Sequence, residues 1–490
     1  MEKDIRWLVL LTVIVGTFLG RLDQTIVNLA LPRIIDEFSI TVTQAGWIAT
    51  AYILANAVFV PIWGKLGDTI GRKKVYLWGF GIFIFGSVLA GLSWDLSSMI
   101  VFRIIQAIAS SADYPTAMAI IAVTFREGKE RAQALGLWST AFAASAVFGP
   151  LIGGPLIDTF GWRSVFLINL PVGIVGIIMA VMFVKESTSE KKTVKFDWLG
   201  ALTLGITLCA LVLVLDKGME WGWLSIESVL CYATIVGFGY IFYQIDSKHP
   251  EPIVDFKFFK IGAFTNTLIN NFIVFMGMMG SLFLLPVFVQ TFLGYDATQT
   301  GFIFMPMAFG MILAAPLGAS LVGKVQPKYV IAASTLVAAI GLFMFTGLDP
   351  RSGPMDLVIP VLIMSFGMGF GMSQRTSIIA WAVPEQEIGV ASSVLALARN
   401  IAGAFGIALF ATILNNAVEN NVLNIASNSI INTNNPLILQ QVVPLMILKA
   451  QISAYPTVFI LSTAIVLIGA VLALGINVKE KKSGAEVFVE

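Results

Sequence analysis

The 490-residue chain has few of the side chains that perform chemistry in enzymes and metal sites. It contains one histidine, His249, and two cysteines, Cys209 and Cys231, and only 12% of its residues are charged. Two thiols in apolar stretches give no disulfide framework, and a histidine beside a proline is typical of a solvated loop. The Walker pattern GxxxxGK[ST] is also absent, so nothing favours ATP-driven work. We expect neither an enzyme nor a bound cofactor or metal.

Neither positive nor negative charge is in excess, since the chain has 30 Lys and Arg residues and 29 Asp and Glu residues. The net charge is +1, which gives no electrostatic case for nucleic-acid binding. Apolar residues are abundant instead: 57% of the chain is hydrophobic and the mean hydropathy is +0.87, far above that of a soluble domain. The N-terminal MEKDIRW leads straight into an apolar segment without a small-residue cleavage site, which predicts a retained first membrane span.

Long apolar segments predict an all-α polytopic membrane protein. A helix needs about 20 apolar residues to cross the hydrocarbon core. Fourteen segments meet this length, near residues 7–31, 44–63, 75–94, 98–124, 132–157, 164–184, 197–215, 222–244, 263–290, 299–323, 329–347, 356–382, 388–417 and 455–478. If the N-terminus is inside and the spans alternate, most Lys and Arg residues face the inner side, so both termini are expected in the cytoplasm and the protein in the cell membrane.

Two polar segments, Lys185–Asp197 and Asp246–Lys260, divide the spans into six, two and six. We expect an N-terminal six-helix bundle (1–185), a linker with two additional transmembrane helices between the bundles (186–260), and a C-terminal six-helix bundle (261–490). The last bundle should carry a long, asparagine-rich extracellular loop at about 417–454. In the C-terminal bundle, the segment Gly318–Val330 occupies the position that Gly64–Lys74 has in the N-terminal bundle and weakly repeats its sequence. Such related halves are typical of transporters.

The segment GKLGDTIGRKK, Gly64–Lys74, is predicted as a cytoplasmic junction between two spans. Its cations resist translocation. Its glycines permit close backbone approach, and Asp68 can meet a helix N-terminus or a basic partner. In the fifth predicted span, Gly149-Pro150 removes a backbone donor and should bend the helix, while Gly153 and Gly154 allow close packing. We assign conformational gating to Gly64, Asp68, Gly71, Arg72, Gly149, Pro150, Gly153 and Gly154.

These segments resemble signatures of the major facilitator superfamily. Gly64–Lys74 resembles its loop between spans two and three, and Leu22–Pro32 the first-span motif of the fourteen-span drug:proton antiporter branch. Further likenesses run through Arg103–Pro115, Phe148–Asp158, Gly161–Gly173, Leu285–Phe302 and Ala391–Gly406. Two residues depart from the fourth-span pattern, since Ala107 replaces a usual glycine and Asp113 a usual small residue. The resemblance implies the major facilitator fold and, through the fifth span, an exporter.

Charges inside the spans are the main functional candidates, because a charge at the bilayer centre costs about 3 kcal/mol or more. Helix rise places Asp23 and Arg103 in the outer halves of spans one and four, near one another, with Arg21 and Asp113 closer to the middle. Either Asp23 or Asp113 takes and releases a proton during transport, or the pairs Arg103–Asp23 and Arg21–Asp113 are permanent and hold helices together. Gln106 shares a helix face with Asp113.

The last six spans are predicted to contain a single charge well inside them, Arg399. The sum of the buried charges is then +1, which favours a lipophilic substrate that is monocationic, zwitterionic or neutral and leaves an anion on Arg21 or Arg399 open. Methionines at 276, 278 and 279 suit varied apolar ligands. The further cavity candidates are Gln24, Asn28, Asn270, Asn271 and Gln290.

We therefore expect a monomeric, proton-coupled antiporter that exports small amphipathic compounds such as drugs and dyes by alternating access. Its partners would be a small lipophilic substrate, protons and membrane lipid, with no nucleic acid. Symport or facilitated uptake of a small metabolite by the same fold is the main alternative. A polytopic membrane enzyme lacks a recognisable site here, and a sensor would differ only in showing no flux.

Overall fold

The computed structural model describes residues 3–125, 128–186, 197–250, 252–321, 324–383, 388–428 and 436–477, and every regular element in these ranges is a helix. The first group of helices comprises α1 (Lys3–Phe38), α2 (Val42–Ile70), α3 (Arg72–Gly91), α4 (Leu96–Ser110), α5 (Asp113–Thr124), α6 (Gly128–Phe160), α7 (Ser164–Leu167) and α8 (Asn169–Phe183). A helical backbone satisfies its own polar groups, as a lipid environment requires.

The remaining helices follow in two sets. A pair, α9 (Trp198–Trp221) and α10 (Ile226–Asp246), precedes the short 3-10 helix η1 (Phe256–Lys260). The final set is α11 (Gly262–Phe292), α12 (Ala297–Ser320), α13 (Pro327–Met344), the 3-10 turn η2 (Phe345–Gly347), α14 (Met355–Trp381), α15 (Ile388–Ser427) and α16 (Pro436–Ala473).

Twelve helices among the described residues are long and apolar enough to cross a membrane, against the fourteen spans expected. One difference lies in the predicted fourth span, which is divided into α4 and α5. Pro115 has no N–H to donate to the carbonyl of Ser111, so the hydrogen-bond ladder is interrupted at this step. Asp113 consequently lies in the first turn of a new helix and not in the middle of a continuous one.

Side chains cap several helix starts at the ends of the bundle. The Thr41 hydroxyl accepts from the backbone N–H of Gln44, whose amide oxygen accepts from the N–H of Thr41. Asp95 and Ser98 make the same reciprocal arrangement at the start of α4. The backbone N–H of Ser98 also lowers the pKa of the Asp95 carboxyl by stabilising its charged form. These caps fix where the chain leaves the connecting turns and enters each helix.

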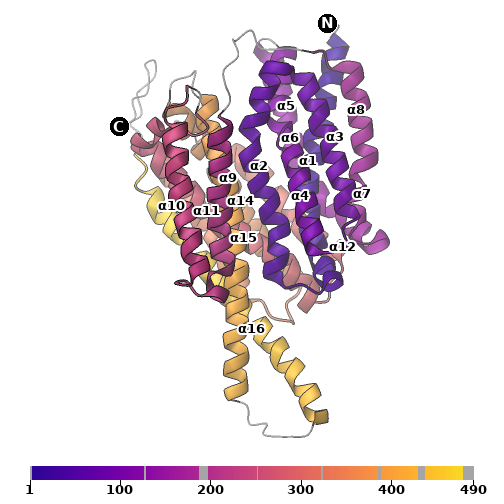
Figure 1. Cartoon of the computed structure of the whole chain (residues 1–490), viewed down its shortest axis with the longest axis vertical. Helices are drawn as coiled ribbons and strands as arrows, with labels where there is room; N and C mark the ends of the chain where they lie inside the picture. The colour runs from indigo at the N-terminus through magenta and orange to yellow at the C-terminus, as the bar shows by residue number, and fades with distance from the viewer. Residues whose placement is uncertain are drawn as a thin grey trace.

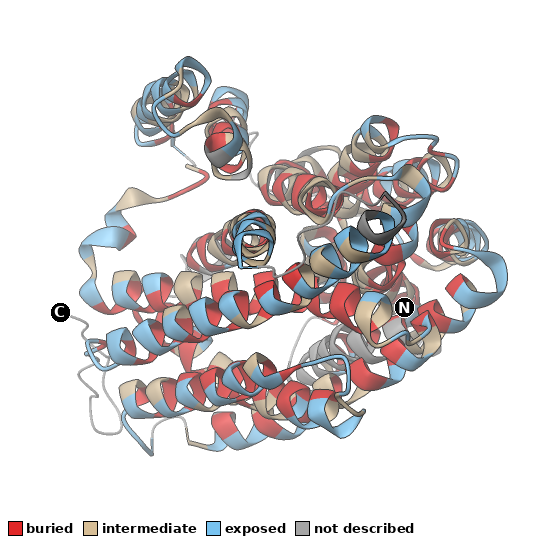
Figure 2. Cartoon of the chain, turned by 90° about the horizontal axis from the view of Figure 1, so that it is seen from below, coloured by how far each residue is buried: buried red, intermediate tan, exposed pale blue. Residues whose placement is uncertain are grey.

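The helices form two groups with a pair between them (Figure 1). Helices α1–α8 pack with one another, and α11–α16 form the second group. Helix α9 contacts both α2 and α15, whereas α10 packs mainly on α9. Figure 2 shows buried residues chiefly where helices face one another, with exposed residues on outward faces. Many of those exposed residues are large and apolar, for example Phe85, Met182 and Val236.

The two groups meet most extensively at the end of the molecule where α1 finishes, at the bottom of Figure 1 and here named the lower end. There α6 packs on α12, α2 on α15 and α1 on α11. The hydroxyl of Thr43 donates to the carbonyl of Ala411 at 3.2 Å, and Nε2 of Gln290 donates to the carbonyl of Leu29 at 3.0 Å. One hydrophobic core runs through this contact and includes residues of both groups. The upper end is the one at which α1 begins.

Two long helices project beyond the lower end (Figure 1). Helix α15 has 40 residues and α16 has 38, so most of the segment expected as a loop at 417–454 is helical, apart from residues 429–435, which lie outside the described ranges. Apolar side chains such as Leu423 and Leu445 are largely exposed on this projection. Helix α15 therefore continues through several asparagines and ends at Ser427, although asparagine favours turns.

The junction between α2 and α3 is shorter than the sequence indicated. Helix α2 continues to Ile70, and only Gly71 separates it from Arg72 at the start of α3. Gly71 has φ of 116°, a conformation that favours glycine, and a Cβ here would meet the carboxylate of Glu186. That carboxylate accepts from the backbone N–H groups of Lys73 and Lys74 at 3.1 and 3.2 Å. Glu186 thus meets the α3 N-terminus, a role the sequence had suggested for Asp68.

Candidate functional site

Asp23 and Arg103 form a buried ion pair at the centre of the first group. Nη1 of Arg103 (α4) lies 2.6 Å from Oδ2 of Asp23 (α1), and neither side chain is more than 2% exposed. The same nitrogen donates to Oε1 of Gln106, one turn further along α4. The predicted proximity of Asp23 and Arg103 is therefore correct, and the pair takes the geometry of a charge-assisted hydrogen bond.

Neutral donors complete the environment of the Asp23 carboxylate. Its Oδ1 accepts from Nε2 of Gln106 at 2.9 Å and from Nδ2 of Asn169 (α8) at 2.8 Å. Both amides also donate to Ser87 (α3), whose hydroxyl donates to the carbonyl of Phe166. This network links α1, α3, α4, α7 and α8. Sequence reasoning identified Gln106 but missed Ser87 and Asn169, because polar uncharged residues in apolar segments do not reveal which helix they face.

An aromatic ring covers the other side of the Arg103 guanidinium. The guanidinium carbon lies 4.0 Å from the centroid of the Tyr52 ring on α2. The Tyr52 hydroxyl donates to Ser110 at 2.7 Å, and Nδ2 of Asn56 donates to the same oxygen at 3.0 Å. The cation–π contact and the ion pair together enclose the Arg103 guanidinium and shield its charge from lipid.

Asp113 lies in a separate cluster nearer the upper end. Its Oδ1 accepts from the hydroxyl of Thr17 (α1) at 3.1 Å, and that hydroxyl accepts from Nε1 of Trp138 (α6) at 2.9 Å. Asp113 is only half-buried and borders a small cavity between α1, α3 and α4. Arg21 donates to Oε1 of Gln24 on its own helix at 3.0 Å and lies within electrostatic range of Asp113. Asp113 and Gln106 both contact α1, but the break between α4 and α5 means that they do not share a face of one continuous helix, which their seven-residue spacing had predicted.

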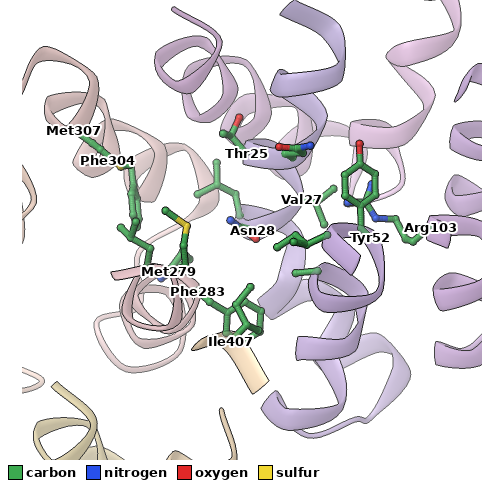
Figure 3. A pocket seen from close by; sticks show the side chains of 16 residues that line it. Thr25, Val27, Asn28, Tyr52, Arg103, Met279, Phe283, Phe304, Met307 and Ile407 are labelled. Carbon is green, nitrogen blue, oxygen red and sulfur yellow. The ribbon is translucent and has the colours of Figure 1, made fainter. Parts of the chain in front are cut away.

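A cavity of about 230 Å³ lies between the two groups of helices (Figure 3). Its polar wall comes from the first group, and its opposite wall is apolar. The polar and charged lining residues of the first group are Gln24, Thr25, Asn28, Tyr52 and Arg103, and the second group contributes Met279, Leu282, Phe283, Pro286, Phe304, Met307 and Ile407. The predicted cavity residues Gln24 and Asn28 are at this site, whereas Asn270, Asn271 and Gln290 are not among the residues that line it. None of the described residues that line the cavity is an acid.

The second group contains a buried arginine that sequence reasoning missed. Arg375 (α14) is 2% exposed, and its Nε donates to Oδ1 of Asn270 (α11) at 2.9 Å while Nη2 donates to the hydroxyl of Thr335 (α13) at 2.8 Å. Asn270 donates in turn to the carbonyl of Gly469 (α16) at 2.6 Å. The prediction that Arg399 is the only charge well inside the last six spans is wrong. An arginine inside the apolar segment 356–382 was the available signal.

Arg399 lies one helix away from Arg375. Its Nε donates to Oδ1 of Asn271 at 3.3 Å, and its guanidinium carbon is 5.2 Å from the centroid of Phe275. Correcting the count to include Arg375 raises the sum of the charges inside the spans from +1 to +2. The membrane-spanning part of the chain is therefore more positive than expected from the sequence, and the argument for a cationic substrate is weaker.

Glycines on α6 allow close packing on α1 within the first group and, at Gly154, on α12 of the second group. A Cβ on Gly149 or Gly153 would collide with Thr25 or Ile26 of α1, and one on Gly154 would lie 2.5 Å from the Cα of Thr298 on α12. The carboxylate of Asp158 then accepts from the backbone N–H of Thr298 at 2.8 Å and from its hydroxyl at 2.6 Å. Close packing by these glycines agrees with the prediction, whereas the side chain of Pro150 lies outside the described part of the structure.

Comparison with known proteins identifies the family. The model of the Major Facilitator Superfamily matches residues 13–407. The chain belongs to this superfamily. It is 32% identical to the multidrug transporter protein MdtP of Bacillus subtilis (strain 168) over 84% of this chain and 76% of that protein. It is 30% identical to the riboflavin transporter RibZ of Clostridioides difficile (strain 630), over 83% and 88% respectively.

Solved structures agree on the fold. A bacterial homologue of the human lysosomal transporter Spinster, in an inward-facing and unoccupied conformation, superposes with a TM-score of 0.71 at 16% identity over 97% of each chain. The match to the superfamily model and the transporter relatives confirm the superfamily expected from the motifs, and the chain is a transport protein and not an enzyme. Among the superfamily residues assigned to gating, Gly64 and Asp68 have side chains outside the described structure, and Arg72 is half-buried beside Gly71.

Proposed function

We propose that this major facilitator protein exports small amphipathic compounds across the cell membrane in exchange for protons, by alternating access. The cavity between the two helix groups carries this proposal, because one wall offers hydrogen-bonding side chains and the other offers methionine and aromatic surface. Adaptable apolar walls suit substrates of varied shape. Relatives named for multidrug transport and for resistance to tetracenomycin C and methylenomycin A support export.

We further propose that the chain spans the membrane fourteen times as a monomer with both termini in the cytoplasm. Helix α6 and the α4–α5 pair, added to the twelve helices that pass on length and hydropathy, would complete two six-helix bundles and the α9–α10 pair. The division into 1–185, 186–260 and 261–490 follows from this count. The exposed apolar side chains on outward helix faces would contact lipid.

Alternating access requires the contact at the lower end to open. The lower end would face outward, since α1 begins in the cytoplasm in this topology. In the described arrangement the outer side is closed by the packing of α6 on α12 and of α2 on α15. Gly154 and Asp158 lie in this contact and would separate from the α12 start when the outer side opens. A gating role for Gly154 follows from that movement, whereas Gly149 and Gly153 would keep α6 packed on α1 as the first group moves.

Of the two acids, Asp113 is the better candidate for proton exchange. The Asp23 carboxylate is surrounded by Arg103, Gln106 and Asn169 and is shielded from the cavity by the Arg103–Tyr52 stack. Asp113 is half-buried, at a helix break, and accepts a hydrogen bond from Thr17. Arg21 lies near enough to bias its protonation. We therefore assign proton transfer to Asp113 and helix attachment to Asp23.

A proteoliposome assay tests the assignment. Wild-type protein and the Asp113→Asn variant would be reconstituted with a fluorescent dye and an imposed pH gradient. We expect wild-type to move dye uphill and Asp113→Asn to allow only downhill exchange, since the variant side chain cannot release a proton. Asp95→Asn, at the exposed start of α4, is the matched control and should transport normally. Uphill transport by Asp113→Asn at the wild-type rate would contradict the proton assignment.

One relative is named as a riboflavin transporter, which supports testing a second function, the transport of a small metabolite by symport or facilitated uptake. A symporter or facilitator of a small metabolite would raise the internal concentration of its substrate, whereas an exporter lowers it. Cells that express the chain in a pump-deficient host should therefore retain less dye and tolerate more of a toxic substrate than cells with an empty vector. Greater retention of substrate in expressing cells would favour uptake instead.

A further inference from the structure

Two neighbouring asparagines on α11 each hold one arginine from a different helix. Asn270 accepts from Nε of Arg375 at 2.9 Å, and Asn271 accepts from Nε of Arg399 at 3.3 Å. The two guanidinium groups are consequently close enough to repel one another. Within the described ranges, no Asp or Glu forms an ion pair with either arginine. This region thus concentrates positive charge that its described neighbours leave uncompensated.

Donor atoms beside Arg399 also lack acceptors. Nη2 of Arg399 and Nδ2 of Asn271 are buried and make no hydrogen bond in the described structure, and the same holds for Oγ1 of Thr267, one turn earlier on α11. The side chains of Asn271 and Thr267 are fully buried. A buried polar group without a partner costs about 1–3 kcal/mol. An acceptor with negative charge in this region would give such donors a partner and would offset the charge of both arginines.

The cluster lies on α11 and α15, two of the helices that also line the central cavity. Met279 on α11 and Ile407 on α15 line the cavity, and Asn271 and Arg399 lie two helical turns before them, or about 12 Å along each helix. Phe275 lies between, against the Arg399 guanidinium. Arg399 is half-buried, and Tyr114 of α5 interacts with it electrostatically from the other helix group. The guanidinium of Arg399 is therefore directed toward the first helix group.

We propose that Arg399, Asn271 and Thr267, assisted by the positive charge of Arg375, bind the carboxylate of an anionic amphipathic substrate whose apolar body occupies the central cavity. The inference rests on the proposed export function and narrows its substrate class. The described lining of the cavity presents no acid that would repel such a substrate, and the carboxylate of Asp23 behind Arg103 is engaged by that arginine. The buried carboxylate of Asp23 likewise offers no attraction to cations.

Three probes with one apolar body and different head groups test the proposal. Pyrenebutyrate is an anion, its methyl ester is neutral, and a pyrenebutyl-trimethylammonium salt is a cation. Binding to the full-length protein in phosphatidylcholine nanodiscs would be followed by pyrene fluorescence anisotropy in sodium isethionate buffer. We expect wild-type protein to bind the anion about tenfold or more tightly than the ester, as charge-assisted hydrogen bonds allow. Equal binding of anion and ester, or tightest binding of the cation, would overturn the proposal.

Two variants locate the effect. Arg399→Gln should bring the anion-to-ester affinity ratio to about one, with ester affinity within about twofold of wild-type. Asn271→Asp should also bring the anion-to-ester affinity ratio to about one, because it places a permanent carboxylate beside the arginines. It should in addition raise the thermal unfolding midpoint. This second variant keeps the test decisive if Arg399→Gln folds poorly. Lys449→Gln, which removes an exposed cation on the projecting part of α16, should keep the wild-type ratio. An unchanged ratio in both site variants refutes the assignment.

A free inorganic anion is the competing source of the same chemistry. Replacing isethionate by chloride should leave the wild-type ratio unchanged. If chloride abolishes the ratio and stabilises wild-type but not Arg399→Gln, the site takes a free anion, and the substrate assignment is wrong. Proton-driven export of the ester probe, measured in parallel, separates the two proposals: export without anion preference refutes only this inference, whereas loss of export of all three probes refutes the function.

Discussion

The two helix groups stabilise buried arginine in different ways. In the first, Arg103 is paired with Asp23 at 2.6 Å, and two amides occupy the remaining oxygen of the carboxylate. In the second, Arg375 has an amide and a hydroxyl as its acceptors, and Arg399 has one amide. The first centre is close to neutral, and the second is positive among the described residues. The charge of Arg103 is therefore already paired within the first group, whereas Arg375 and Arg399 have no paired carboxylate among the described residues.

This difference changes what the same residue type can do. A guanidinium that is already paired gains little from an anionic ligand, because binding would first require the existing pair to separate. A guanidinium held only by neutral oxygens keeps most of its attraction for an anion. The superfamily fold thus positions two helix groups around one cavity, and the acceptor of the buried arginine differs between them, a carboxylate for Arg103 and an amide for Arg375 and Arg399.

The largest expected effect is in the first centre. Asp23→Ala should lower the free energy of unfolding by about 3–5 kcal/mol, since it leaves Arg103 buried without a counter-charge. Denaturant titration in detergent measures the loss. The double variant Asp23→Ala/Arg103→Met should recover most of the stability, because the unpaired charge is gone. If the double variant is no more stable than Asp23→Ala, the pair is not what links these helices.

An intermediate effect is expected in the second centre. Asn270→Leu should lower the free energy of unfolding by about 2–3 kcal/mol, because Nε of Arg375 and the carbonyl of Gly469 both lose a partner. The same titration would compare it with Asn420→Leu, an exposed asparagine on α15 that should change stability by less than about 0.5 kcal/mol. Similar losses in the two variants would show that Asn270 does not support Arg375.

The smallest effect is expected for an ion pair of equal length at the surface. Glu37 accepts from Nη1 of Arg163 at 2.6 Å, and both side chains are about 40% exposed or more. Glu37→Gln should cost about 0.2–1 kcal/mol, less at high salt, because water and ions already screen the charges. A loss as large as that of Asp23→Ala would mean that burial does not explain the contrast between the exposed and buried pairs.

The proximity of Asp23 and Arg103 could be predicted from the sequence because helix rise gives the depth of each residue in its span. Opposite charges at the same depth are expected to pair, since an unpaired charge inside the membrane is costly. The partners Ser87 and Asn169 could not, since serine and asparagine are common on any helix face and the rotation of α3 and α8 is set by packing. Arg375 was visible as a charge in an apolar segment and was overlooked. The break at Asp113 followed from Pro115, whose effect on the ladder a hydropathy pattern does not register.

The sequence alone determined that this chain crosses a membrane and which superfamily it resembles, because apolar length and short motifs are local properties that survive without knowledge of contacts. Only the tertiary structure decided that the Asp23 carboxylate is fully engaged, that Asp113 is half-buried beside Thr17, and that Asn270 and Asn271 bring two arginines together. Those outcomes depend on how each helix is rotated about its axis. Rotation is set by the packing of small and large side chains from distant segments, which no single span encodes.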